Sequence, residues 1–141
     1  MTLSPEEKLS LCEARFQRAR EFLDDARFNH EQHRVKTSVN RSYYAALSAA
    51  RAVLILEGAD PERHEGVVTL LSLRFVKPGL LPVSAIKQFK TLLSRRTDVD
   101  YGDFESVDAA DAADSLQIAG AFLDTLEKIK ARLVPGLSIK P

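Results

Sequence analysis

The chain has 141 residues, of which 45% are hydrophobic and 28% charged, and its formal net charge is zero. This length and composition are typical of one globular domain with a buried core and exclude a disordered chain. The single cysteine excludes an intramolecular disulfide, and no apolar run is long enough for a signal peptide or a membrane span. We expect one cytoplasmic domain over residues 1–141, with a core of about residues 4–133 and a C-terminal tail at 134–141.

The first predicted helix begins at "SPEE", residues 4–7, a capping-box pattern with proline at the first helical position. Apolar residues then recur at spacings of three and four to about Phe28, as in an amphipathic helix. Cys12 lies in this stripe, so we expect a small core residue there and not a reactive thiolate. A polar stretch over residues 29–38 leads to the next helix.

The second predicted helix, "VNRSYYAALSAARAVLILEG" at residues 39–58, ends at a glycine. It has one stripe of core residues and one face of small residues. The stripe contains Tyr43, Leu47, Ala50 and Leu54, and the small face contains Ala45, Ser48, Ala49 and Ala52. Small side chains let another helix approach closely, either inside the fold or across a dimer contact.

Three further helices are predicted in the second half of the chain. A short one covers residues 67–76 and ends at Lys77-Pro78-Gly79, and the next opens at Pro82. The last is capped by Ser106 and has an apolar stripe from Ala112 to Leu133. No segment alternates with a period of two, so the predicted fold is all-α, an antiparallel up-and-down bundle of four main helices plus one short helix.

The stretch "SRRTDVDYGDF", residues 94–104, holds the main candidate site. The helical register puts Arg96 on the apolar side and Arg95 in the outward row. A buried guanidinium needs a partner, and Asp100 lies four residues further on, so we predict an Arg96–Asp100 ion pair. The pair either closes a helix end or belongs to a functional pocket. Tyr101 either stacks on a base, donates a hydrogen bond or is modified at its hydroxyl, or it only plugs the end of the bundle.

No metal or cofactor site is predicted. Asp98, Asp100 and Asp103 do not have the spacing of a calcium loop, and neither a P-loop nor a dinucleotide-binding turn occurs. From Arg63 to Arg96 the chain has seven basic residues and one acidic residue. This segment either binds a phosphate-bearing partner or is a solvated face that the acidic last helix neutralises.

Several segments together resemble the prokaryotic HEPN domains, in particular their small stand-alone branch. These are "NRSYYAALSAARAVLILEG", "HEGVVTLLSLRFVKPGLLP", "RRTDVDYGDF" and "AADSLQIAGAFLDTLEKIKARL", in matching order over roughly residues 8–133. The resemblance implies a helical bundle, usually a homodimer, with a cleft for a nucleotide or RNA. It also implies a ribonuclease toxin paired with a minimal nucleotidyltransferase antitoxin, or an RNA-cleaving part of a defence system.

The family signature is an arginine followed, after four to six residues, by a histidine. Here Arg95 is followed after four residues by Asp100, and Arg96 by Tyr101, so the histidine is absent. Arg27 and His33 have the formal spacing but lie on the first helix, the wrong element. In the paired toxins of this family the partner enzyme modifies a tyrosine near the motif with AMP, and Tyr101 is the residue that resembles it.

Three functions remain open at this point. The first is a nucleotide- or RNA-binding component that uses Arg96 with help from Arg95 and Tyr101, beside a nucleotidyltransferase. The second is a metal-independent ribonuclease with an altered catalytic site of Arg96, Asp100 and Tyr101. The third is a purely structural or assembly module.

Overall fold

The structure, a computed structural model, describes residues 2–102 and 106–137. These residues form helices only: α1 (Pro5–Glu31), α2 (Val35–Leu56), α3 (His64–Leu71), α4 (Val83–Tyr101) and α5 (Ala109–Leu133). A π-helical turn, η1 (Ser72–Val76), continues α3, and a short 3-10 turn, η2 (Val134–Gly136), follows α5. The predicted all-α class is confirmed. None of the helices in the described ranges is both long and apolar enough to cross a membrane.

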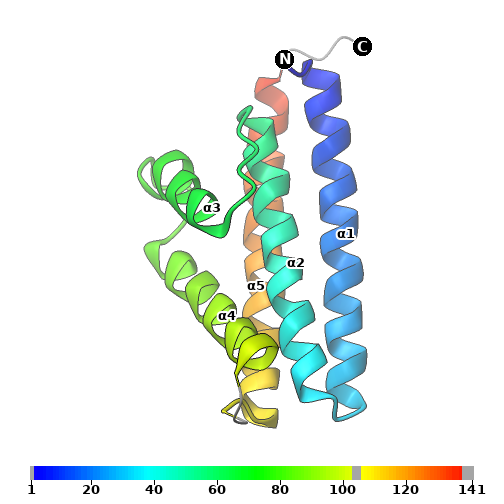
Figure 1. The fold of residues 1–141 in the computed structure, drawn as a ribbon. Coiled ribbons are helices and arrows are strands. Elements are labelled where there is room, and N and C mark those ends of the chain that lie inside the picture. The colour runs from blue at the N-terminus through cyan, green and yellow to red at the C-terminus, as the bar shows by residue number, and fades with distance from the viewer. Residues whose placement is uncertain (1, 103–105, 138–141) are drawn as a thin grey trace.

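The helices form an up-and-down bundle around α2 (Figure 1). α1, α2 and α5 run along the length of the molecule, α1 antiparallel to α2, while α4 crosses them obliquely. α2 packs against α1, α4 and α5, and the short α3 packs against α2 and η1. The predicted four main helices and one short helix are therefore present, with α4 tilted away from the common axis.

The burial of α2 comes from its small side chains. Ala45, Ala49 and Ala52 are completely buried, so most of the predicted small-residue face lies inside the fold, whereas Ser48 is only half-buried. Tyr43 and Leu54 of the larger stripe are buried as expected, whereas Leu47 is only half-buried. Alanine at these positions lets neighbouring helices pack close to the α2 backbone. The core formed in this way continues through α1, α3, η1, α4 and α5.

Three helix starts differ from the prediction: α3 begins at His64 instead of residue 67, and side-chain hydrogen bonds accompany the other two differences. α2 begins at Val35 instead of residue 39, because the Ser38 hydroxyl donates to the Ala26 carbonyl of α1 at 2.8 Å and fixes this polar turn. Asp108, and not Ser106, caps α5. Its carboxylate accepts from the Asp111 amide at 2.9 Å, and the Asp111 carboxylate accepts from the Asp108 amide at 3.1 Å. This is a reciprocal capping box with aspartate in place of the usual glutamate.

One carboxylate ties the loop after α2 back to the bundle. Asp60 Oδ1 lies 3.0 Å from Arg15 Nη1 of α1 and 3.1 Å from Arg51 Nη2 of α2. Burial alone would raise the pKa of Asp60, but the hydrogen bonds and positive charges of Arg15 and Arg51 outweigh it and lower this pKa. The two ion pairs therefore persist into mildly acidic solution.

The buried thiol gives a first prediction. Burial raises the pKa of Cys12 to about 11, although the charges of Lys130 and Arg15 oppose the rise. We expect the native protein at neutral pH to resist a charged thiol reagent, and the urea-unfolded protein to take up one label per chain. Mass spectrometry of both samples measures the labelling. Stoichiometric labelling of the native protein would contradict the buried position.

Asp60 gives a pH-dependent prediction. Because its pKa is lowered on folding, its ionised form stabilises the fold above the unfolded pKa of about 3.9, and this stability is lost as the pH falls below that value. We expect the urea midpoint of unfolding at pH 7 to be higher for wild type than for Asp60→Asn. This difference in midpoint should become smaller below about pH 4. Asp24→Asn, which removes an exposed pair with Arg27, serves as the control. An Asp60 difference that stays constant down to about pH 2 would show that ionisation is irrelevant.

Candidate functional site

The packing of α4 on α2 brings six polar and aromatic side chains together around one guanidinium. We call them the Arg96 cluster: Asn40, Tyr43 and Tyr44 from α2, and Arg96, Asp100 and Tyr101 from α4. Asn40 and the two tyrosines share a face of α2 because they are separated by three and four residues. Arg96 and Asp100 are one helical turn apart on α4 for the same reason.

Two polar contacts hold Arg96. Its Nη2 donates to the Tyr44 hydroxyl oxygen at 2.8 Å, and its Nε lies 3.0 Å from Asp100 Oδ2. The second contact is an ion pair, because the Nε–H does not point well enough at the carboxylate for a hydrogen bond. The predicted Arg96–Asp100 pair is confirmed, and the arginine side chain is only 19% exposed.

Three aromatic rings surround the same guanidinium. Arg96 Cζ lies 5.4 Å from the ring centres of both Tyr43 and Tyr44, and 5.7 Å from that of Tyr101. Rings at this distance attract a cation without neutralising it. Tyr43 is buried and leads into the core through Phe89, whereas Tyr101 is 73% exposed. The cluster thus has a buried aromatic wall and an aromatic ring that faces solvent.

Asn40 holds Asp100 in place from the other helix. Its Nδ2 donates to both carboxylate oxygens, at 3.2 and 3.1 Å, and its Oδ1 accepts from Arg41 Nη1 at 3.1 Å. The sequence pattern did not indicate a role for Asn40 or Tyr44. Their spacing of four residues on a helix was a usable signal, but nothing in the sequence shows which face of α2 meets α4.

The local environment keeps the arginine charged. Burial would lower the pKa of Arg96. The hydrogen bond to Tyr44 and the nearby oxygens of Tyr44, Asp100 and Tyr101 outweigh this effect, so the pKa is raised above its ordinary value. Burial also raises the pKa of Tyr43, which the positive charge of Arg96 only partly offsets, so this tyrosine stays neutral. The cluster offers a fixed cation, hydroxyl groups and a carboxylate, which are groups that recognise phosphate and sugar oxygens.

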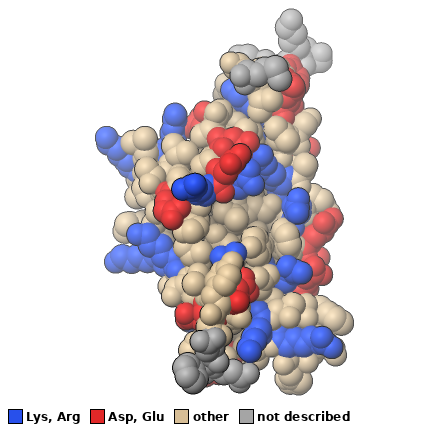
Figure 2. Space-filling model, viewed as in Figure 1, with Lys and Arg blue, Asp and Glu red and all other residues tan. Residues whose placement is uncertain are grey.

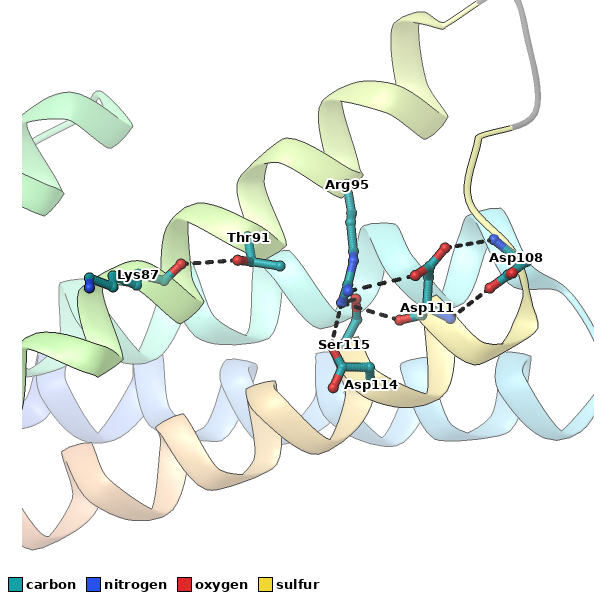
Figure 3. A network of polar contacts seen from close by, with 7 residues as sticks. All are labelled: Lys87, Thr91, Arg95, Asp108, Asp111, Asp114 and Ser115. Atoms are coloured by element: carbon teal, nitrogen blue, oxygen red, sulfur yellow. Dashed lines mark hydrogen bonds and ion pairs between the residues drawn. The ribbon is translucent and has the colours of Figure 1, made fainter.

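Arg95 has a different environment, and the prediction that it points outward is wrong. Its Nη1 donates to Asp114 Oδ2 at 2.8 Å and to the Ser115 hydroxyl at 3.0 Å, and its Nη2 lies 3.6 Å from Asp111 Oδ1 (Figure 3). The side chain is only 20% exposed. The tilt of α4 turns Arg95 toward the acidic first turns of α5, where it joins the two helices.

The other sequence candidates lie outside the Arg96 cluster. Arg27 pairs with Asp24 on the surface of α1 at 3.1 Å, and His33 lies in the turn between α1 and α2 with a positive φ of 58°. Asp103 falls outside the described residues. Within residues 2–102 and 106–137, no three or more His, Cys, Asp or Glu side chains are placed to hold a metal ion.

A family model described as the HEPN domain matches residues 12–129, from the first half of α1 to the last turns of α5. The chain belongs to the HEPN family. The whole Arg96 cluster lies inside the matched region. At the place where the resemblance led us to expect the family histidine, this HEPN chain has Asp100 and Tyr101.

Its relatives come from bacteria and archaea. A UPF0332 protein of Thermotoga maritima is 32% identical over 87% of this chain and 93% of its own length. A UPF0332 protein of Gloeobacter violaceus is 30% identical over 87% of this chain and 98% of its own length. A Methanocaldococcus jannaschii protein named "Putative toxin MJ0605" is 33% identical over 45% of this chain and 47% of its own length.

The bond between the two helices can be tested by a double-mutant cycle of Tyr44→Phe and Arg96→Gln. Each single variant removes a partly buried hydrogen bond to a charged group, so we expect each to lower the free energy of unfolding by about 1–3 kcal/mol. The coupling between them should be about 0.5–1.5 kcal/mol, measured by urea unfolding. Tyr101→Phe is the control, because its ring makes the contact with Arg96. A coupling of zero would remove the Tyr44–Arg96 bond from the folded state.

Proposed function

We propose that this HEPN protein binds a phosphate-bearing ligand, a nucleotide or RNA, through Arg96. The observation that carries the proposal is a guanidinium kept charged, fixed by Tyr44 and Asp100, and placed beside the exposed ring of Tyr101. An arginine held in this way loses little conformational entropy when it binds an oxyanion. Family membership supports the same class of ligand.

Each side chain of the cluster has a separate part in the proposed binding. Arg96 donates charge-assisted hydrogen bonds to phosphate oxygens. Tyr101 stacks on a base, because its ring is exposed and lies at the edge of the cluster. Asp100 and Asn40 orient the guanidinium, but the negative charge of Asp100 also repels an anion. We therefore expect a single phosphate to bind weakly and a base-bearing ligand to bind better.

The proposed setting is a homodimer in the cytoplasm that works with a separate minimal nucleotidyltransferase, as one component of a toxin–antitoxin or defence-type pair. Support comes from the family and from the relative whose name calls it a toxin. Arg95 is not assigned to the ligand, because Asp111 and Asp114 already share its charge.

A ribonuclease is the second candidate, and the Tyr44 hydroxyl is the observation in its favour. This oxygen accepts a hydrogen bond from Arg96, so it keeps its own hydrogen to donate near a bound phosphate. Asp100 would be the proton acceptor, and Tyr101 the third group of this altered catalytic site. Binding without cleavage fits the cluster better, because the Arg96 cluster contains no histidine.

The binding proposal is tested by titrating wild type, Arg96→Ala and Tyr101→Ala with AMP, ATP, inorganic pyrophosphate and a labelled single-stranded RNA. Calorimetry or fluorescence anisotropy measures the affinity. We expect Arg96→Ala to lose about tenfold or more for every ligand. Tyr101→Ala should lose about tenfold for the base-bearing ligands and leave pyrophosphate unaffected.

Arg27→Ala is the matched control, since this arginine of α1 is exposed and, among the described residues, forms an ion pair only with Asp24. It should bind all ligands as wild type does. Equal affinity in Arg96→Ala would remove Arg96 from the site, and failure of wild type to bind any of the ligands would favour a structural module. RNA cleavage by wild type that Arg96→Ala and Tyr44→Phe both lose would establish the ribonuclease instead.

A further inference from the structure

A second positively charged surface lies beside the Arg96 cluster, in the groove between α1 and α2. We call it the α1–α2 groove; its lining consists of Arg15, Arg18, Phe22, Tyr44, Leu47, Ser48 and Arg51. Its volume of about 360 Å³ falls within the range of ~300–1,000 Å³ that is usual for ligand sites. Arginines and aromatic rings on one groove are the combination that binds the phosphates and bases of single strands.

Two arginines are restrained without being neutralised: Arg18 in the lining of the groove, and Arg41, which lies beside the groove against the Phe22 ring. The guanidinium of Arg18 lies 5.6 Å from the ring centre of Phe22, and that of Arg41 lies 5.8 Å from the same ring. Neither forms an ion pair with any residue of the described ranges. A ring contact limits the motion of a guanidinium and leaves its full charge available to an anion.

The other two arginines of the groove share one carboxylate. Arg15 and Arg51 both contact Asp60 Oδ1, so two positive charges face a single negative charge. Arg15 also donates to the Arg51 carbonyl at 3.1 Å, which fixes the position of its guanidinium. Together with Arg18 and Arg41, the groove carries an excess of positive charge that a chain of phosphates would complement.

The groove is continuous with the Arg96 cluster through Tyr44. This tyrosine lines the groove, accepts the hydrogen bond from Arg96, and has its ring centre 5.9 Å from that of Phe22. The steps from Arg96 to Tyr44, Phe22 and Arg18 are each shorter than 6 Å. If one phosphate of a strand binds Arg96, the next phosphates of that strand would therefore lie toward the groove.

The charged side chains on this face are of both signs. In Figure 2, Lys and Arg side chains occur from near the top of the molecule to its lower end, with Asp and Glu side chains among them and along the right-hand edge. A strand of several nucleotides can contact Arg96 and the arginines beside Phe22 together, with bases stacked on guanidinium planes or on Tyr101.

We propose that the α1–α2 groove binds the phosphates of a single-stranded polynucleotide whose next phosphates reach Arg96. This inference rests on the proposed function of Arg96 and makes the ligand a strand and not a mononucleotide. Arg18 and Arg41 are its phosphate-contacting residues, Phe22 positions them, and Asp60 limits the affinity of the groove.

The test is fluorescence anisotropy with labelled strands of two lengths, a dinucleotide and a strand of about 16 nucleotides, each made as RNA and as DNA. We expect Arg18→Ala/Arg41→Ala to weaken the long strand about tenfold and to leave the dinucleotide unchanged. Log affinity decreases linearly with log salt concentration, and the double variant should make this dependence shallower by about 1.4, which is about 0.7 for each lost phosphate contact. Asp60→Asn should strengthen long-strand binding.

Arg27→Ala, another exposed arginine of α1, should leave long-strand affinity and the salt slope unchanged. The single variant Arg18→Ala repeats the test with one exposed side chain if the double variant has a lowered urea midpoint. Equal binding of RNA and DNA supports a groove that accepts either strand. Tighter binding of one of them also supports the groove and identifies that strand as its ligand. Unlabelled polyuridylate and polyglutamate are then compared as competitors of the long strand. If polyglutamate displaces the strand as effectively as polyuridylate, the groove binds an acidic protein segment and the proposal is overturned.

The two proposals fail in distinguishable ways. If Arg96→Ala abolishes binding of both strands while the groove variants bind the long strand as wild type does, the Arg96 site stands and the groove is overturned. If the groove variants weaken the long strand while Arg96→Ala changes neither ligand, the groove stands as an independent surface and the Arg96 function fails.

Discussion

The burial of α2 between three other helices is the constraint on which the rest of this structure depends. A helix enclosed by α1, α4 and α5 carries its charged side chains along its exposed edges and at its ends, and the polar residues that it buries, Ser38 and Ser42, are small. Complete burial of its alanines brings the neighbouring backbones close. The edge that remains, with Asn40 and Tyr44, then meets α4 at the turn that presents Arg96 and Asp100.

Two adjacent arginines show how the same side chain acquires opposite roles. Arg95 is surrounded by oxygen atoms of α5, and two carboxylates share its charge, so its bonds hold α4 against α5. Arg96 has one carboxylate and three aromatic rings, which attract a cation while leaving it able to bind a further anion. Aromatic surroundings, more than net charge, distinguish Arg96, for which we propose ligand binding, from the structural Arg95.

The Arg96 cluster and the α1–α2 groove are the features of this HEPN fold on which the proposed binding function rests. Family membership establishes the bundle but does not supply the missing histidine. What the fold retains is a row of guanidiniums that runs from Arg96 past Tyr44 and Phe22 toward Arg15, only partly neutralised by Asp60 and Asp100. Such a surface suits recognition of phosphates, whereas proton transfer would depend on tyrosine and aspartate alone.

The sequence by itself determined the helical class, the number of main helices and the Arg96–Asp100 pair, because these depend on local periodicity and on spacing within one helix. It did not determine the start of α2 at Val35 or the cap of α5 at Asp108, since a bond to the Ala26 carbonyl and an aspartate capping box override the simpler signals there. Only the tertiary structure decided that Asn40 and Tyr44 join the cluster and that Arg95 turns to α5. Those outcomes depend on the tilt of α4 and on the pairing of helix faces far apart in the chain, which no local pattern encodes.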